Sequence, residues 1–287
     1  MVQGSRGYCH YRVFCQDGYR FVNLNLTITS AIHLEKLIRH FTQPIGIFIE
    51  INTGYNRSGI WHEDNNKIIE LVQSVEKENY MDFKGLLIHS GNTYEAASKK
   101  EIENIYQEDT GKLLKIKEEI KDITNQCIIS VGDTPSCSLV ENLKPADEIR
   151  PGNFIFFDIT QLNIGSCKPE DIATVMACPV VDKNPREKEI IIHGGAIHFS
   201  KDVLYDNNEP YYGVYGGKSP QTWDNPDFNT RIRRLSQEHG IIKGSKDFYQ
   251  SVTIGEILLF YPVHSCLTAD CMKQYLEKGG KKIMLMK

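Results

Sequence analysis

Apolar and polar residues follow two different rhythms along the chain. From about residue 20 to residue 160, short apolar runs alternate with longer stretches whose apolar residues recur at helical spacing. Such alternation is typical of βα units around a parallel sheet or barrel. The predicted strands are Ile45 to Ile51, Phe83 to His89, Cys127 to Val131 and Phe154 to Phe157, and the predicted helices are one capped by Ser30, His62 to Tyr80 and Glu95 to Ile123.

Beyond Cys167 the pattern changes to short strands separated by Gly, Pro, Asn and Asp. We therefore expect a second, mainly antiparallel β domain. The domains are expected to span residues 1–165 and 166–287. The predicted strands of the second are Glu189 to His193, Tyr211 to Tyr215, Asn229 to Leu235, Phe248 to Val252 and Ile257 to Val263.

Charge and composition narrow the classes of partner. Lys and Arg number 33 against 37 Asp and Glu, without a block of like charge, which argues against nucleic acid or an anionic membrane as main partner. No apolar run approaches the ~20 residues that span a bilayer, and the N-terminus shows no signal-peptide core. The eight cysteines have no framework spacing, which fits reduced thiols. We expect a cytoplasmic protein.

Polar residues follow the ends of the predicted parallel strands, where βα folds carry their chemistry. Arg57 lies between two glycines after the first strand and could aim a permanent charge into the mouth of the barrel. The alternative is an exposed loop with a solvated arginine. His89 and Tyr94 follow the second strand, although a single histidine there is more often structural.

Two further turns suit a phosphate. Thr134 lies in a Gly-Asp-Thr-Pro-Ser turn after the third strand, where backbone amides and hydroxyls could cradle an anion. Gly152 and Asn153, just before the strand predicted at Phe154, could contribute another pair of amides. The alternative is that Gly-Asp-Thr-Pro is an ordinary turn.

His264 and Cys266 follow the last predicted strand with one residue between them. In an extended segment the two side chains share a face, and imidazole and thiolate both suit zinc. Two protein ligands leave coordination positions open, as catalytic sites do. The alternative is a small buried Cys266 beside a hydrogen-bonded His264.

In consistent order from about residue 28 to the C-terminus, the chain resembles the D-serine dehydratase and D-threonine aldolase group of pyridoxal-phosphate enzymes, built like alanine racemase. The resemblance implies a (β/α)8 barrel followed by a β domain. It rests on the strings at 50–59, 89–94, 132–136, 148–154, 236–240 and 262–268.

The resemblance also implies residue roles. Arg57 would face the pyridine nitrogen, Tyr94 would line the site, and Thr134, Gly152 and Asn153 would bind the phosphate. His264 and Cys266 would be metal ligands for Zn²⁺. The substrate would be a D-amino acid with a β-hydroxyl, and relatives of this architecture are often homodimers.

His264 and Cys266 help to distinguish between two possible reactions, dehydration and aldol cleavage. A zinc ion acts as a Lewis acid on a leaving hydroxyl, or holds that hydroxyl during aldol cleavage. Aldolases of the group tend to have His-x-Asp where this chain has His-x-Cys, which favours the dehydratase reaction.

One expected feature is missing. Such enzymes hold the cofactor through a Schiff base to a lysine on the first barrel strand, and residues 1 to about 20 contain no matching stretch. We therefore expect a barrel that is incomplete at its N-terminus, without the Schiff-base lysine, and a solvated Lys201. The alternatives are a non-catalytic cofactor-binding protein and an inactive fragment, although a pure binder needs neither the second domain nor the His-x-Cys pair.

Overall fold

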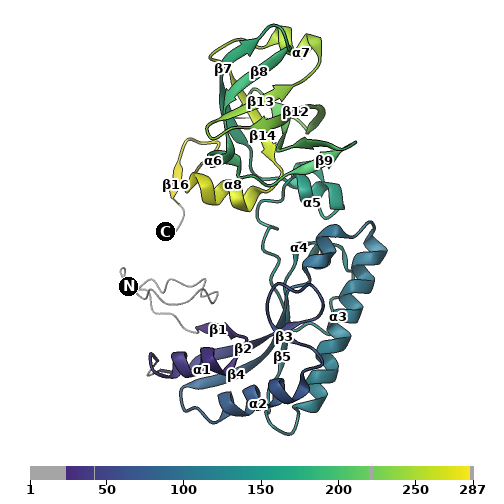
Figure 1. Cartoon of the computed structure of the whole chain (residues 1–287), viewed down its shortest axis with the longest axis vertical. Coiled ribbons are helices and arrows are strands. Elements are labelled where there is room, and N and C mark those ends of the chain that lie inside the picture. Colours follow the sequence, from purple (N-terminus) through teal and green to yellow (C-terminus); the bar gives the residue numbers. More distant parts are fainter. Residues whose placement is uncertain (1–23, 42, 220–222, 285–287) are drawn as a thin grey trace. The chain divides into compact units, whose positions relative to one another are not determined.

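The computed structural model describes residues 24–41, 43–219 and 223–284 (Figure 1). The chain divides into two compact units, Met1–Gly152 and Asn153–Lys287. This division falls earlier than the expected boundary at 165/166, because Asp158 and Thr160 hydrogen-bond to the 263–265 segment of the second unit. The expectation for residues 1 to 20 lies outside the described residues.

The first unit is built of βα units, as predicted. The Ser30 hydroxyl caps its first helix by accepting a hydrogen bond from the backbone N–H of His33. Its elements are β1 (Asn25–Ile28), α1 (Ala31–Ile38), β2 (Ile45–Asn52), β3 (Ile60–Trp61), α2 (Asn65–Glu76), β4 (Met81–Ile88), α3 (Lys99–Glu119), β5 (Ile128–Val131), α4 (Thr134–Leu139) and β6 (Glu148–Ile149).

The main sheet of this unit has the order β1-β2-β4-β5-β6, and all of its neighbouring strands are parallel. Sequential order with right-handed crossovers places α1, α2 and α3 on the same face. The core lies between that face and the helices, with Ile47, Ile49, Ile68 and Leu86 almost fully buried. Parallel strands end at one edge, so the loops after β2, β4 and β5 are neighbours there.

The second unit is mainly antiparallel β structure, as predicted. Six strands form a closed barrel in the order β11-β12-β13-β8-β7-β14 around a core that includes Phe199 and Phe260. Its elements are α5 (Ile159–Ile164), β7 (Met176–Asn184), β8 (Glu189–His193), α6 (Ala196–Phe199), β9 (Leu204–Asp206), β10 (Glu209–Tyr211), β11 (Gly213–Gly217), β12 (Asp227–Leu235), β13 (His239–Lys243), α7 (Lys246–Ser251), β14 (Ile257–Pro262), α8 (Ser265–Met272), β15 (Gln274–Leu276) and β16 (Lys282–Met284).

The fold class is confirmed: a parallel α/β unit precedes an antiparallel barrel. Within residues 24–152 the parallel strands form an open sheet instead of a closed barrel. Two predicted strands are wrong. Phe154 to Phe157 is a turn in which the N–H groups of Phe156 and Phe157 donate to the carbonyl of Asn153. Phe248 to Val252 belongs mostly to α7, which Ser245 caps.

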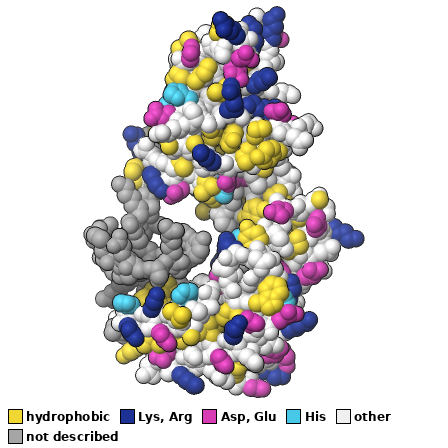
Figure 2. Space-filling view, in the orientation of Figure 1, with side chains coloured by type: hydrophobic (Ala, Val, Ile, Leu, Met, Phe, Trp, Pro, Cys, Tyr) yellow, Lys and Arg dark blue, Asp and Glu magenta, His cyan; other side chains and the backbone are white. Residues whose placement is uncertain are grey.

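On the face seen in Figure 2, basic and acidic side chains are interspersed over both units. This agrees with the near balance of charge in the sequence. Among the described residues, no helix combines the length and the apolar character that crossing a membrane requires.

Candidate cofactor and metal site

Arg57 lies in the loop after β2. Its Nη2 atom is 3.9 Å from Glu50 Oε1, and its side chain is 46% exposed. Ser58 donates a shorter bond, 2.8 Å, to the same carboxylate oxygen. The loop turns back at Gly59, which has φ +104 and would place a Cβ 2.7 Å from the backbone nitrogen of Asn52. A guanidinium held at this distance can still donate to an acceptor such as a pyridine nitrogen.

His89 follows β4 and lies against two phenol rings. Its ring centroid is 5.6 Å from that of Tyr55 and 6.5 Å from that of Tyr94. Burial and the charge of Arg57 lower the pKa of His89 to about 4, although its Nδ1 is 2.5 Å from the carbonyl oxygen of Gly132. The imidazole is therefore neutral at neutral pH.

Thr134 begins α4, directly after β5. The Tyr94 hydroxyl accepts a 3.3 Å hydrogen bond from the backbone N–H of Thr134, so the structure brings two predicted site residues together. Asp133 caps the helix by accepting from the N–H of Ser136 at 2.6 Å, and burial raises the pKa of Asp133. The Ser136 hydroxyl is buried beside the Asp133 carboxylate. This turn therefore offers donors that fit a phosphate.

Gly152 and Asn153 stand at the division between the units. A Cβ on Gly152 would meet nothing within 4 Å, so the space beside it is open. The side chain of Asn153 is directed to the 265–266 segment: its Nδ2 donates to Asp158 Oδ2 at 2.5 Å, and its Oδ1 accepts from the Ser265 hydroxyl at 2.9 Å. A phosphate role for Asn153 would therefore use the backbone N–H.

The prediction that His264 and Cys266 lie in an extended segment is wrong. Strand β14 ends at Pro262 and helix α8 begins at Ser265, so Cys266 lies in the first helical turn and only His264 is extended. The chain turns here because the buried Asp158 carboxylate accepts from the Ser265 N–H at 3.0 Å. The two side chains are nevertheless hydrogen-bonded to each other.

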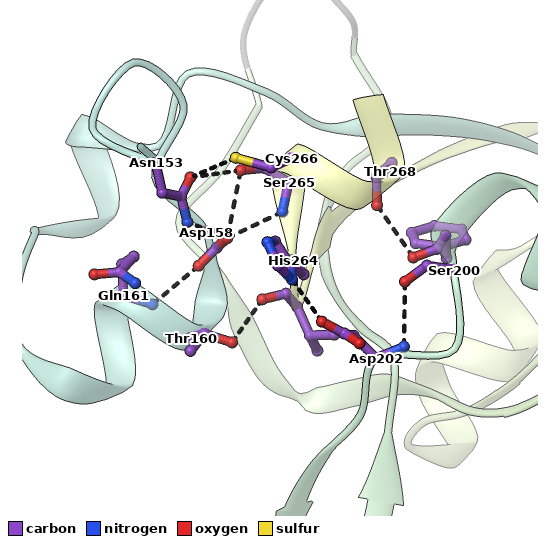
Figure 3. A network of polar contacts seen from close by, with 12 residues as sticks. Asn153, Asp158, Thr160, Gln161, Ser200, Asp202, His264, Ser265, Cys266 and Thr268 are labelled. Carbon is purple, nitrogen blue, oxygen red and sulfur yellow. Dashed lines mark hydrogen bonds and ion pairs between the residues drawn. The ribbon is translucent and has the colours of Figure 1, made fainter. Parts of the chain in front are cut away.

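The other nitrogen of His264 has a carboxylate partner (Figure 3). His264 Nδ1 lies 2.5 Å from Asp202 Oδ2. Burial acts to lower the pKa of His264, but the hydrogen bonds with Cys266 and Asp202 and the charge of Asp158 raise it to about 9. A histidine that ligates a metal through one nitrogen commonly donates its other N–H to a carboxylate, which fixes the ring. This arrangement, with a neighbouring thiol, fits a zinc ion at Nε2 and Sγ.

Within the described ranges, no three His, Cys, Asp or Glu residues converge as metal ligands. A metal on His264 and Cys266 would keep coordination positions open; that a metal binds there stays a prediction. Lys201 is exposed in the segment after α6, also as predicted. Arg57, Tyr94, Thr134 and Gly152 belong to the first unit, and Asn153, His264 and Cys266 belong to the second.

Sequence reasoning missed Asp158 and Asp202. Asp202 lies 62 residues from His264, and Asp158 lies 107 residues from Ser265. Such separations carry no periodic signal. The only local sign is Asp158 itself, an N-cap residue type directly before the apolar start of α5, where it accepts from the Gln161 N–H at 3.0 Å.

Two family models match this chain. The model described as "Alanine racemase, N-terminal domain" matches residues 15–159, about half of the chain. The model described as "Putative serine dehydratase domain" matches residues 173–277.

Named proteins are similar to most of the chain. D-serine dehydratase of Dictyostelium discoideum is 27% identical over 277 residues, covering 88% of this chain and 67% of that protein. D-threo-3-hydroxyaspartate dehydratase of Delftia sp. is 25% identical over 255 residues, covering 87% of this chain and 66% of that protein. The solved structure of the Delftia enzyme superposes with a TM-score of 0.79 at 23% identity, covering 91% of this chain and 71% of that one, which shows the shared fold.

Three findings agree: the two family models, the similar named proteins, and the fold, in which a parallel unit is followed by an antiparallel barrel. This chain therefore belongs to the alanine racemase-like pyridoxal-phosphate enzymes, in the lyase family of D-serine dehydratase and its relatives.

Proposed function

We propose that this chain forms part of a pyridoxal-phosphate- and zinc-dependent lyase that eliminates the β-hydroxyl group of D-amino acids as water. Water then hydrolyses the released imine, so the net products are a 2-oxo acid and ammonia. The observation that supports this most directly is the contact between His264 and Cys266, with Asp202 on the far nitrogen of the imidazole. The chain spans about two thirds of the length of the curated relatives it matches, so the activity is proposed for the protein that contains it.

Four residues and one backbone amide would hold the cofactor, whose chemistry is to accept the negative charge that develops at the α-carbon. Arg57 would donate a hydrogen bond to the ring nitrogen without giving up its proton, because a guanidinium does not titrate in this range. Tyr94 would line the site. Thr134, Gly152 and the backbone N–H of Asn153 would bind the phosphate.

His264 and Cys266 would hold zinc, and the chemistry that zinc supplies there is Lewis-acid assistance to a departing β-hydroxyl. A ring nitrogen left unprotonated makes the cofactor a weaker electron sink, so assistance at the leaving group matters more. A structure of the Delftia enzyme with a cysteine changed to alanine is described as being in the metal-free form.

Dehydration is the reaction we propose in preference to aldol cleavage. The substrates named for the two relatives, D-serine and D-threo-3-hydroxyaspartate, both carry a hydroxyl at the β-carbon. The His-Ser-Cys sequence also favours the dehydratase reaction, since aldolases of the group tend to have aspartate in the third place.

An end-product assay tests the proposal. The protein, supplied with pyridoxal phosphate and zinc, is incubated with D-serine, D-threo-3-hydroxyaspartate, D-threonine and, as control, L-serine. We expect a 2-oxo acid and ammonia from a D-substrate, none from L-serine, and loss of activity with a zinc chelator that is restored by zinc. Glycine and an aldehyde from D-threonine would instead indicate an aldolase, and no product from any substrate would contradict the lyase.

A further inference from the structure

Asp158 is a buried carboxylate that collects donors from two separate stretches of the second unit. It is fully buried. Its Oδ1 accepts from the Gln161 N–H at 3.0 Å, while its Oδ2 accepts from the Asn153 amide at 2.5 Å and from the Ser265 N–H at 3.0 Å. A carboxylate with this many donors is held firmly and in turn fixes the groups that donate to it.

Two of these donors lead directly to Cys266. Ser265 is its neighbour in the chain, and the Ser265 hydroxyl bonds both Asn153 Oδ1, at 2.9 Å, and Asp158 Oδ2, at 3.4 Å. The thiol of Cys266 lies 3.6 Å from the same Asn153 oxygen. Figure 3 shows Asn153, Asp158, Ser265 and Cys266 converging at the start of α8. The direction of the Cys266 side chain is thus set from the turn at 153–158.

His264 is fixed from another element, since its carboxylate partner is Asp202 in the segment after α6. The two side chains proposed to hold metal therefore have separate supports, Asp202 for the imidazole and Asp158 with Asn153 for the thiol. A two-ligand site needs both supports, because His264 is extended and Cys266 is helical, so the backbone between them does not fix both side chains together. The Ser265 bonds to Asp158 hold the first turn of α8 together with the bond from the Ser265 hydroxyl to Asn153.

We infer that Asp158 is a positioning residue for the metal site: through Ser265 and Asn153 it holds Cys266 at the distance from His264 that a shared ion requires. This inference rests on the proposed function, since it concerns the same two ligands. Partners that orient metal ligands typically contribute 10–100-fold to metal affinity. We expect the Asp158 carboxylate to contribute about tenfold or more.

The test is a zinc titration of the full chain by competition with a chromophoric chelator. Asp158→Asn keeps the shape of the side chain but places an amide where a carboxylate oxygen accepts, so we expect about tenfold or greater loss of zinc affinity. Asp206→Asn is the matched control, since Asp206 pairs with Arg231 of β12 at 2.7 Å in the same unit. This control should leave zinc affinity unchanged.

A spectrum separates positioning from folding. Co²⁺ bound by a cysteine thiolate gives a near-ultraviolet charge-transfer band, and this band should weaken in Asp158→Asn but persist in Asp206→Asn. If Asp158→Asn does not fold, Asn153→Ala removes the amide relay, and Ser265→Ala removes the hydroxyl bonds while it keeps the backbone N–H bond to Asp158. Each variant should lower zinc affinity several-fold. Wild-type affinity in both would overturn the inference.

The outcomes also distinguish this inference from the proposed function. Unchanged affinity in Asp158→Asn, with loss in Cys266→Ala, overturns the inference and leaves the metal site standing. Equal losses of affinity and of melting temperature in Asp158→Asn and Asp206→Asn also overturn it, because the effect is then general. Zinc binding that is absent from the wild type defeats the proposed metal site itself.

Discussion

His264 Nδ1 and Asp202 Oδ2 lie 2.5 Å apart although 62 residues separate them in the chain. The side chains are 37% and 48% exposed, so this contact stands at the surface of the second unit. The contact orients the imidazole more than it stabilises the fold, since partly exposed ion pairs contribute little to folding stability. An imidazole fixed through Nδ1 presents Nε2 in one direction.

The first prediction concerns this contact. Asp202→Ala should lower zinc affinity about tenfold, because a ligating histidine without its carboxylate partner loses its orientation and part of its basicity. Isothermal titration with zinc measures the change, and Asp202→Asn should show a smaller loss because it can still accept a hydrogen bond. Zinc affinity within twofold of wild type in Asp202→Ala would show that Asp202 does not orient His264 for zinc binding.

The second prediction concerns His89. In the unfolded chain its imidazole takes up a proton near the ordinary pKa of 6.5, whereas burial and the charge of Arg57 lower the folded pKa to about 4. The unfolded state therefore binds more protons between these values, and stability falls as the pH decreases from about 6.5 to about 4. With the partial exposure of the ring, we expect this group to contribute on the order of 1–2 kcal/mol.

Urea unfolding of the wild type and of His89→Gln at pH 7.5 and pH 4.5 checks this. The difference in unfolding free energy between the two pH values should be smaller in the variant, because glutamine does not titrate. An equal pH dependence in both proteins would show that His89 is not held neutral.

The third prediction uses two glycines of the first unit. Gly85 in β4 has φ +156, and a Cβ there would lie 2.0 Å from the carbonyl oxygen of Ile128 in the neighbouring strand. Gly85→Ala should therefore destabilise the unit by about 2–4 kcal/mol. Gly111 lies inside α3 with nothing within 4 Å of a Cβ, so Gly111→Ala should stabilise by up to about 1 kcal/mol.

Thermal unfolding followed by circular dichroism measures both changes. The opposite signs are the test, since the substitutions are chemically the same. A similar melting temperature for the two variants would contradict the register of β4 against β5.

Local pattern predicted most of the fold. Glu189 to His193 has the bounds predicted for it, and the Ser30 cap is where the sequence placed it. The apolar run Phe154 to Phe157 misled because two of its side chains, Phe154 and Ile155, are more than half exposed in a turn. A four-residue apolar run does not reveal whether it faces a core.

The site could be predicted only in part, because the sequence pattern reports on residues close together in the chain. Spacing predicted that His264 and Cys266 share one face of an extended segment, but Cys266 lies in a helical turn, from which its side chain still interacts with His264. Asp158 and Asp202 could not be predicted because tertiary packing alone joins them to this segment. The resemblance supplied residue roles, but not the contacts that orient those residues.

The most direct measurement for the central claim is zinc per chain, by elemental analysis after dialysis, in the wild type, Cys266→Ala and Cys271→Ala. Both cysteines belong to α8, but Cys271 is exposed and has no role in the account. We predict about one zinc ion per chain in the wild type and in Cys271→Ala, and a large loss in Cys266→Ala. Equal zinc in all three proteins would contradict the assignment of Cys266 as a ligand.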